Sequence, residues 1–178
     1  MNEGNIPMKI SVIRTTRTGL KILLRPVEET DKLLVKDFLN NLSVESLRYR
    51  FLSLLNNMLD DFLSKFFIFN FNLEIKILVL IERNKKEELV GIGQFHIDSD
   101  DSLAEVALVV SDNYQNKGIG RELLTYMMQL AINRGLKGFE GIVLTNNRSI
   151  LHICATMGFG TFEKTLRSHG VYELKMYF

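Results

Sequence analysis

The chain has 178 residues, of which 46% are hydrophobic and 24% charged, and its formal net charge is +1. This length and composition are typical of one globular domain that buries about 70% of its unfolded surface. A net charge so close to zero excludes bulk electrostatic attraction to nucleic acid or to a membrane. The single cysteine, Cys154, excludes an internal disulfide, and no apolar run approaches the roughly 20 residues of a membrane span. We therefore expect a cytoplasmic protein.

The first half of the chain is predicted to hold an arm, one strand and three helices. Residues 1–18 are expected to form a partly ordered N-terminal arm, and the domain is expected to cover residues 19–178. Leu20 to Arg25 has the composition of a strand, which Pro26 ends. Apolar residues at helical spacing then predict helices over 31–40, 43–51 and 60–67. Ser43 is well suited to cap the second of these helices.

In the second half, strands alternate with helices. Strands are predicted over 75–83, 89–97, 103–110, 139–144, 159–166 and 171–178. Two helices, over 118–133 and 146–157, are predicted between the later strands because their apolar residues fall on one face. Tight turns join antiparallel strands, whereas helical crossovers join parallel ones. The order of elements therefore predicts an α/β or α+β fold with a mixed sheet.

The most informative segment follows the strand at 103–110. There the chain reads Q-x-x-G-x-G, with Gln115, Gly118 and Gly120, and a helix begins within this pattern. The first N–H groups of a helix have no acceptor inside it, and glycine lets a ligand approach them closely. This combination indicates a site for a phosphate group. Taken alone, the pattern is equally consistent with a helix start that uses glycine only for its turn.

The neighbours of the glycines favour an anion, because Asn116, Lys117 and Arg121 add donors or positive charge. The segment is not a dinucleotide fingerprint, since Leu123 takes the place of the third glycine. It is not the phosphate loop of nucleotide hydrolases either, since Lys117 precedes the glycine. The acidic turn at 98–101 lacks the glycine and the distant glutamate of a calcium loop, so no metal is expected.

A second block follows in the expected order. It consists of the strand Ile142-Val143-Leu144, a helix that starts at Asn146-Asn147, and Gly158-Phe159 after that helix. Together, the two blocks resemble the GCN5-related N-acetyltransferase (GNAT) family over residues 20–178. Within the family, the chain is most similar to the catalytic domain of bacterial Pat-type protein lysine acetyltransferases. The supporting stretches are Arg25-Pro26-Val27, 42–51, 104–107 and 170–174.

The resemblance implies a fold, a cosubstrate and a set of binding residues. The fold would be a mixed sheet of about seven strands, flanked by helices on both faces and splayed between the fourth and fifth strands. Acetyl-CoA would be the cosubstrate, with no metal. Its pyrophosphate would bind the segment from Gln115 to Arg121, and its pantetheine arm would lie along the strand before it. The residues concerned are Leu108, Val109, Val110, Gln115, Asn116, Lys117, Gly118, Ile119, Gly120, Arg121 and Asn147. Asn147 also fits a simple helix cap.

Glu105 is the predicted catalytic residue. A lysine amine, with a pKa of about 10.4, is mostly protonated at neutral pH and must lose a proton before it attacks a thioester. A carboxylate in a partly apolar cleft can accept that proton, directly or through water. The family places its general base at this glutamate, although a structural ion pair would also explain the residue. His96 is the second candidate for the base.

One departure from the family pattern concerns Cys154. Many members that act on small amines have a tyrosine four residues before the glycine of Gly-Phe, where it protonates the leaving thiolate. Cys154 occupies that position here, and a buried thiol is a poor general acid. We therefore interpret Cys154 as a packed small residue rather than a catalytic one.

The function predicted from the sequence is an acetyl-CoA-dependent N-acetyltransferase that modifies a protein lysine. Two alternatives stay open. The acceptor is a small amine, such as a polyamine, an amino acid or an antibiotic, or the chain is a non-catalytic acyl-CoA sensor. The expected protein is a monomer or a homodimer that binds neither nucleic acid nor membrane.

Overall fold

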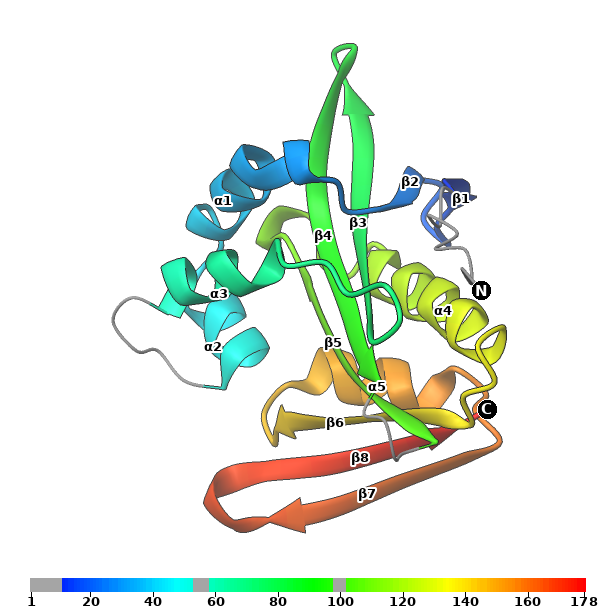
Figure 1. Ribbon diagram of the computed structural model, residues 1–178. Coiled ribbons are helices and arrows are strands. Elements are labelled where there is room, and N and C mark those ends of the chain that lie inside the picture. The colour runs from blue at the N-terminus through cyan, green and yellow to red at the C-terminus, as the bar shows by residue number, and fades with distance from the viewer. Residues whose placement is uncertain (1–10, 53–57, 98–101) are drawn as a thin grey trace, which may run out of the picture.

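The structure is a computed structural model that describes residues 11–52, 58–97 and 102–178 (Figure 1). The acidic turn considered above as a calcium loop lies outside these ranges. Within them, eight strands form one sheet. The strands are β1 (Val12–Thr15), β2 (Lys21–Pro26), β3 (Glu74–Arg83), β4 (Lys86–Ile97), β5 (Leu103–Val110), β6 (Gly138–Leu144), β7 (Thr161–Arg167) and β8 (Val171–Tyr177).

The α-helices in the described ranges lie close to their predicted positions. They are α1 (Lys32–Asn40), α2 (Val44–Phe51), α3 (Met58–Phe66), α4 (Ile119–Ile132) and α5 (Arg148–Thr156). Ser43 caps α2 as predicted, because its Oγ accepts a hydrogen bond from the Ser46 N–H at 3.1 Å. Strand β6 begins at Gly138, one residue before the strand predicted over 139–144. None of the helices in these ranges is long and apolar enough to cross a bilayer.

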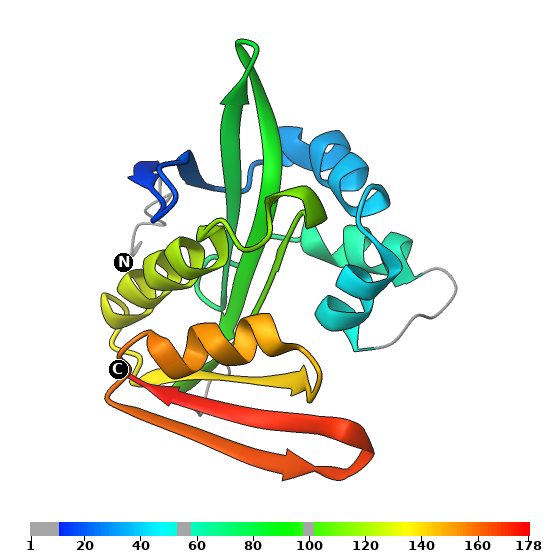
Figure 2. The same cartoon turned by 180° about the vertical axis from the view of Figure 1, so that it is seen from behind.

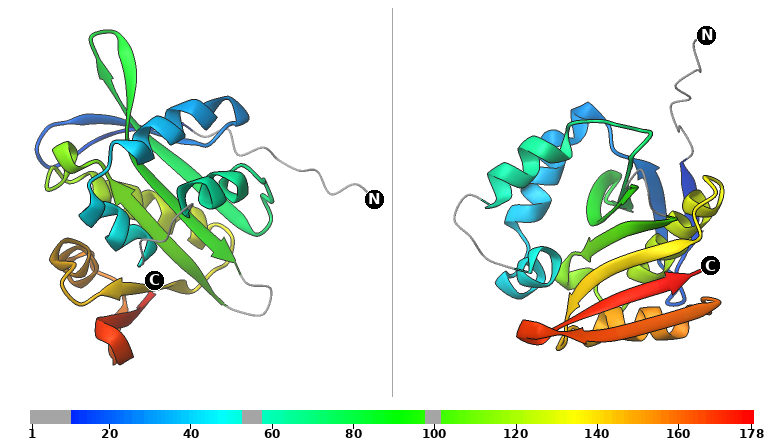
Figure 3. Two further views of the ribbon diagram at one scale, coloured as in Figure 1. Left: turned by 90° about the vertical axis from the view of Figure 1, so that its left-hand side faces the viewer. Right: turned by 60° about the horizontal axis from the view of Figure 1, so that its bottom comes forward.

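The sheet has the strand order β1-β2-β3-β4-β5-β6-β8-β7, and β5 and β6 form its parallel pair. That pairing covers only three residue pairs, from Leu103 opposite Gly138 to Glu105 opposite Glu140. Beyond them the two strands separate, and Figures 1 and 3 show β6 turning away from β5 together with β8 and β7. The predicted splay is confirmed, because the fourth and fifth predicted strands, over 103–110 and 139–144, correspond to β5 and β6. The sheet has one strand more than the seven predicted. This additional strand is β1, which lies in the segment expected to form an arm and pairs with β2.

Helices cover both faces of the sheet. Helices α1, α2 and α3 lie on one face, and α4 and α5 lie on the other, which Figure 2 shows from behind. Each face has its own apolar core. A Cβ on Gly93 of β4 would come within 2.8 Å of the Met127 sulfur of α4, so glycine is what allows this helix to pack so closely. Because side chains alternate along a strand, successive residues of β5 point to opposite faces of the sheet.

Candidate active site

A cavity of about 510 Å³ lies at the opening between β5 and β6. Its walls come from β5, β6, α2, α5 and the glycine-containing loop before α4, so segments from both halves of the chain meet there. The separation of the two strands leaves backbone groups of residues 106–110 outside any pairing with β6. Unpaired strand edges of this kind can hydrogen-bond an extended ligand.

The loop before α4 has the geometry of an anion site. Gly118 has φ +88°, a left-handed conformation that favours glycine, and Asn116 also has a positive φ of 60°. In the described part of the chain, no hydrogen bond uses the N–H groups of residues 116–120 as donors. These donors cluster at the N-terminus of a 14-residue helix, where the helix dipole favours negative charge. The loop is therefore suited to bind a phosphate.

The turn between β1 and β2 contributes to the same end of the cavity. Arg17 and Thr18 line it, and the Thr18 hydroxyl donates a hydrogen bond to the Lys117 carbonyl at 3.0 Å. A Cβ on Gly118 would lie 3.2 Å from the Thr16 Cβ, so this turn also packs tightly against the loop. Arg17 was not predicted as a site residue, because residues 1–18 were expected to form an arm.

Most of the residues predicted to bind the cofactor line this cavity. They are Leu108, Val109, Val110, Gln115, Asn116, Gly118, Gly120, Arg121 and Asn147. Lys117 and Ile119 are not among the residues that line it. The Lys117 ammonium lies over the Tyr114 ring, and Ile119 is only 1% exposed in the core beneath α4. The Ile119 side chain is therefore unavailable to a ligand of the loop, which leaves its backbone N–H.

A polar network fastens α2 to the segment that precedes the loop. Asp112 accepts hydrogen bonds from the Ser43 N–H at 2.9 Å, the Ser43 hydroxyl at 2.5 Å and the Ser46 hydroxyl at 2.8 Å. Gln115 donates to the Ser46 hydroxyl at 2.9 Å and to the Val110 carbonyl at 3.2 Å. Burial opposes the charged form of Asp112, but the bonds from the two serines outweigh it and lower its pKa. The side chain of Gln115 therefore links α2 to the end of β5.

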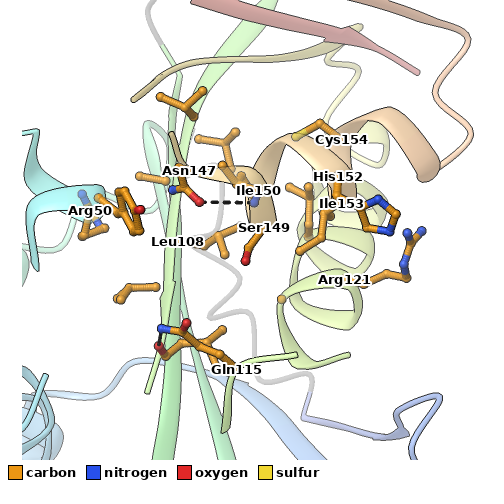
Figure 4. A pocket seen from close by; sticks show the side chains of 18 of the residues that line it. Arg50, Leu108, Gln115, Arg121, Asn147, Ser149, Ile150, His152, Ile153 and Cys154 are labelled. Atoms are coloured by element: carbon orange, nitrogen blue, oxygen red, sulfur yellow. Dashed lines mark hydrogen bonds between the residues drawn. The ribbon is translucent and has the colours of Figure 1, made fainter. Parts of the chain in front are cut away.

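Helix α5 forms the opposite wall of the cavity. Asn147 caps it, because its Oδ1 accepts a hydrogen bond from the Ile150 N–H at 3.4 Å, and the same residue lines the cavity (Figure 4). Cys154 is 3% exposed, and burial raises the pKa of its thiol to about 12. A thiol in this state is inert, which fits a packed residue. His152, exposed on the same helix, also lines the cavity.

Glu105 lies on β5 at the last parallel pair, where the two strands begin to separate. It points to the face that α2 covers, and its cross-strand neighbours are His96 on β4 and Glu140 on β6. Its side chain is exposed and is not among those that line the cavity. In the described part of the chain, this carboxylate is therefore not enclosed by the expected apolar cleft. His96 Nδ1 lies 3.5 Å from the Glu74 carboxylate.

Helix α2 brings Arg50 to the wall beside Glu105. Its guanidinium lies 5.0 Å from the Phe51 ring centroid and 5.4 Å from that of Phe62. Loss of solvent lowers the pKa of Arg50 to about 10, and the negative charge of Glu105 acts in the opposite direction. No role was predicted for Arg50 from the sequence, although the segment 42–51 supports the family resemblance.

Comparison with known proteins identifies the family. The model of the acetyltransferase (GNAT) family matches residues 39–159. The chain therefore belongs to the GNAT family of acetyltransferases. An acetyltransferase of Pseudomonas aeruginosa is 23% identical over 141 residues, which are 79% of this chain and 76% of the relative.

Solved structures share the fold. The GNAT domain of S. lividans PAT superposes with a TM-score of 0.82 at 21% identity, and the match covers 94% of this chain and 97% of that domain. A cAMP-binding acyltransferase from Mycobacterium smegmatis has a TM-score of 0.61 at 24% identity. That match covers 94% of this chain but 47% of the mycobacterial protein. The resemblance to the catalytic domain of Pat-type enzymes is thus confirmed for the fold.

Proposed function

We propose that the protein is an acetyl-CoA-dependent N-acetyltransferase that modifies lysine side chains of a protein in the cytoplasm. The observation that carries the proposal is the cavity between β5 and β6, which has at one end a loop suited to bind a phosphate. Glu105 lies on β5 just outside this cavity, where the two strands begin to separate. The likeness to S. lividans PAT supports this acceptor class through the fold alone.

The proposed reaction needs no covalent intermediate on the protein. The N–H groups of residues 116–120 hold the pyrophosphate of acetyl-CoA, and Asn147 contacts the cofactor from the opposite wall. Donors on the free edge of Leu108–Val110 stabilise the oxyanion that forms when the neutral amine attacks the thioester carbonyl. Glu105 accepts the amine proton, directly or through water, and the departing thiolate takes a proton from solvent. Cys154, with its pKa raised by burial, donates none.

The exposure of Glu105 is compatible with a base. An exposed carboxylate passes its proton to solvent after each turnover, and its place on the face of α2 leaves the other face of β5 to the cofactor. His96 is the second candidate base, but its contact with Glu74 is directed away from β6.

Replacement of Glu105 by glutamine tests the proposal. We expect Glu105→Gln to bind acetyl-CoA as tightly as the wild type in calorimetry. At pH 7.5 it should lose roughly 100-fold in turnover, a typical contribution of a general base. The loss should shrink as the pH approaches the amine pKa of about 10.4, because the acceptor then ionises by itself.

Glu140→Gln is the matched control. Glu140 lies opposite Glu105 on β6, so this variant removes the same charge one strand away. An equal loss in both variants would indicate a general electrostatic effect and remove Glu105 from the base role. Transfer of labelled acetyl groups to small amines but to no protein would overturn the acceptor class. Tight binding of acetyl-CoA without transfer to any amine would favour a sensor.

A further inference from the structure

Arg50 stands out among the charged residues of the cavity because its guanidinium has an unused donor. Arg50 Nη2 is inaccessible to solvent and donates to no hydrogen-bond acceptor in the described part of the chain. Its nearby negative charge is Glu105, with which it forms no ion pair of contact distance within the same ranges. The side chain nevertheless lines the cavity, on the α2 side and across from Asn147 and Ser149 (Figure 4).

The cavity carries cations at two separate places. Arg17 and Arg121 lie at the end formed by the phosphate loop, and Arg121 is tied to α5 through the Thr156 carbonyl at 3.1 Å. Arg50 lies apart from them, on α2 beside Glu105. None of the described residues that line the cavity is an aspartate or a glutamate. The first pair of cations lies where the phosphates of the proposed cosubstrate would bind, whereas Arg50 has Glu105 nearby but forms no contact ion pair in the described part of the chain.

A guanidinium nitrogen that is inaccessible to water and forms no hydrogen bond destabilises the protein that contains it. Its planar donors match a carboxylate with two parallel hydrogen bonds, which is the geometry arginine offers better than lysine. The rings of Phe51 and Phe62 hold the guanidinium in place before a ligand arrives. A site of this kind gains affinity when a ligand supplies the missing anion, because little side-chain freedom is then lost.

We propose that Arg50 binds a carboxylate which the acceptor carries close to its reacting amine. The inference rests on the acyl transfer proposed above and names the acceptor more narrowly. Two sources share this chemistry: an acidic side chain that flanks the target lysine of a protein, and the α-carboxylate of a free amino acid. Arg50 is thus a specificity-determining residue, while Glu105 handles the proton.

The position of Arg50 favours the acceptor over the acyl group as the source of the carboxylate. It lies on the sheet face of α2 and Glu105, where the proton of the amine is removed in the proposed reaction. The opposite wall, formed by α5 and its cap, instead holds Asn147, Ser149 and His152. These residues flank the path from the phosphate loop. An acyl carboxylate is therefore an outcome that the experiment must exclude.

The experiment compares acceptors that differ only in the carboxylate. L-Lysine is paired with cadaverine, and a peptide with aspartate beside its lysine is paired with the same peptide carrying asparagine. We expect the wild type to prefer the carboxylate member of one pair by about tenfold or more in kcat/KM, mainly through KM. The pair that shows the preference identifies the source.

The variants separate recognition from structure. In Arg50→Gln the preference should fall to about onefold, and Arg50→Lys should keep only part of it because a lysine cannot form the bidentate contact. Arg48→Gln, on an exposed position of the same helix, should leave the preference unchanged. Urea unfolding of each variant shows that it is folded. A preference that survives Arg50→Gln, or equal rates within both pairs, would overturn the proposal.

Two further outcomes are distinct. An Arg50-dependent preference for succinyl-CoA over acetyl-CoA, with cadaverine as acceptor, would place the carboxylate on the acyl group and overturn the inference. If no acceptor is acetylated at all, the proposed function fails, and calorimetric titration of the CoA-saturated protein with the same pairs still tests Arg50. Tighter binding of the carboxylate members to the wild type than to Arg50→Gln would then support the carboxylate site.

Discussion

The two walls of the cavity are built in different ways. The wall around the phosphate loop depends on backbone N–H groups that Gly118 and the start of α4 leave free within a few residues of sequence. The wall on the α2 side depends on side chains such as Arg50, which α2 brings near Glu105, a residue 55 positions later in the chain. A backbone site follows from a local conformation, whereas a side-chain site depends on how helices are docked. The second wall should therefore be more sensitive to remote changes.

The largest loss of stability is expected at Asp31, which immediately precedes α1. Arg25 donates two hydrogen bonds of 2.7 Å to the Asp31 carboxylate, which also accepts one from the Glu28 N–H at 2.8 Å. Asp31 is 6% exposed. Asp31→Asn should therefore lower the free energy of unfolding by on the order of 3 kcal/mol, measured in urea at pH 7. Asp37→Asn, at an exposed position of α1, should change it little.

The same residue gives a pH dependence. Burial disfavours the charged form of Asp31, but the hydrogen bonds from Arg25 and Glu28 outweigh this effect, so its pKa lies below the ordinary value of 3.8. The unfolded chain then takes up a proton at a higher pH than the folded one, so stability falls as the pH drops below about 4. The difference in unfolding free energy between the wild type and Asp31→Asn should accordingly shrink from pH 6 to pH 2.5. A difference that stays constant would show that Asp31 does not titrate in this way.

An intermediate effect is expected at the network that joins the two walls. Asp112→Ala removes the acceptor of three hydrogen bonds from Ser43 and Ser46, which should lower the free energy of unfolding by about 1–2 kcal/mol. Because α2 then loses its tie, the KM for the acceptor should rise more than the dissociation constant for acetyl-CoA. Steady-state kinetics and calorimetry measure the two. Asn113→Ala, a neighbouring exposed position, is the control. A larger change in cofactor binding would contradict the proposed division between the walls.

The smallest effect on stability is expected at the loop itself. Gly118→Ala puts a Cβ at φ +88° and 3.2 Å from the Thr16 Cβ, and should cost about 1 kcal/mol of stability. It should also weaken acetyl-CoA binding several-fold, since the loop must shift. Gly135→Ala has a similar φ of +79° with open space around the new Cβ, so it reproduces the backbone strain away from the site. Equal cofactor affinity in the two variants would argue against the loop as the anion site.

Much of the cofactor wall could be predicted from the sequence because its elements are contiguous. The Q-x-x-G-x-G pattern specifies a strand end, a left-handed glycine and a helix start, and these fix where free N–H groups point. The cap at Asn147 was readable for the same reason. The burial of the Ile119 side chain was not predicted, because a helix buries one side of its first turn, and only the packing on the sheet decides which side.

The acceptor wall was far less predictable. Arg50 lies in a short helix whose sequence allows either an exposed or a buried arginine. Strand β1 lies in the segment expected to form an arm, and the turn after it brings Arg17 to the cavity. The exposure of Glu105 was not predicted either, because the sequence of β5 does not show how far the helices on that face cover the strand.

The order of the elements, the mixed sheet, the glycine loop and the family resemblance could be recognised in the sequence, because each depends on short local patterns. Which side chains meet across the opening between β5 and β6 follows from the tertiary structure alone. The same is true of Arg50, whose Nη2 is inaccessible to solvent and donates to no acceptor in the described residues. Such placements depend on contacts between residues far apart in the chain, and no local pattern records them.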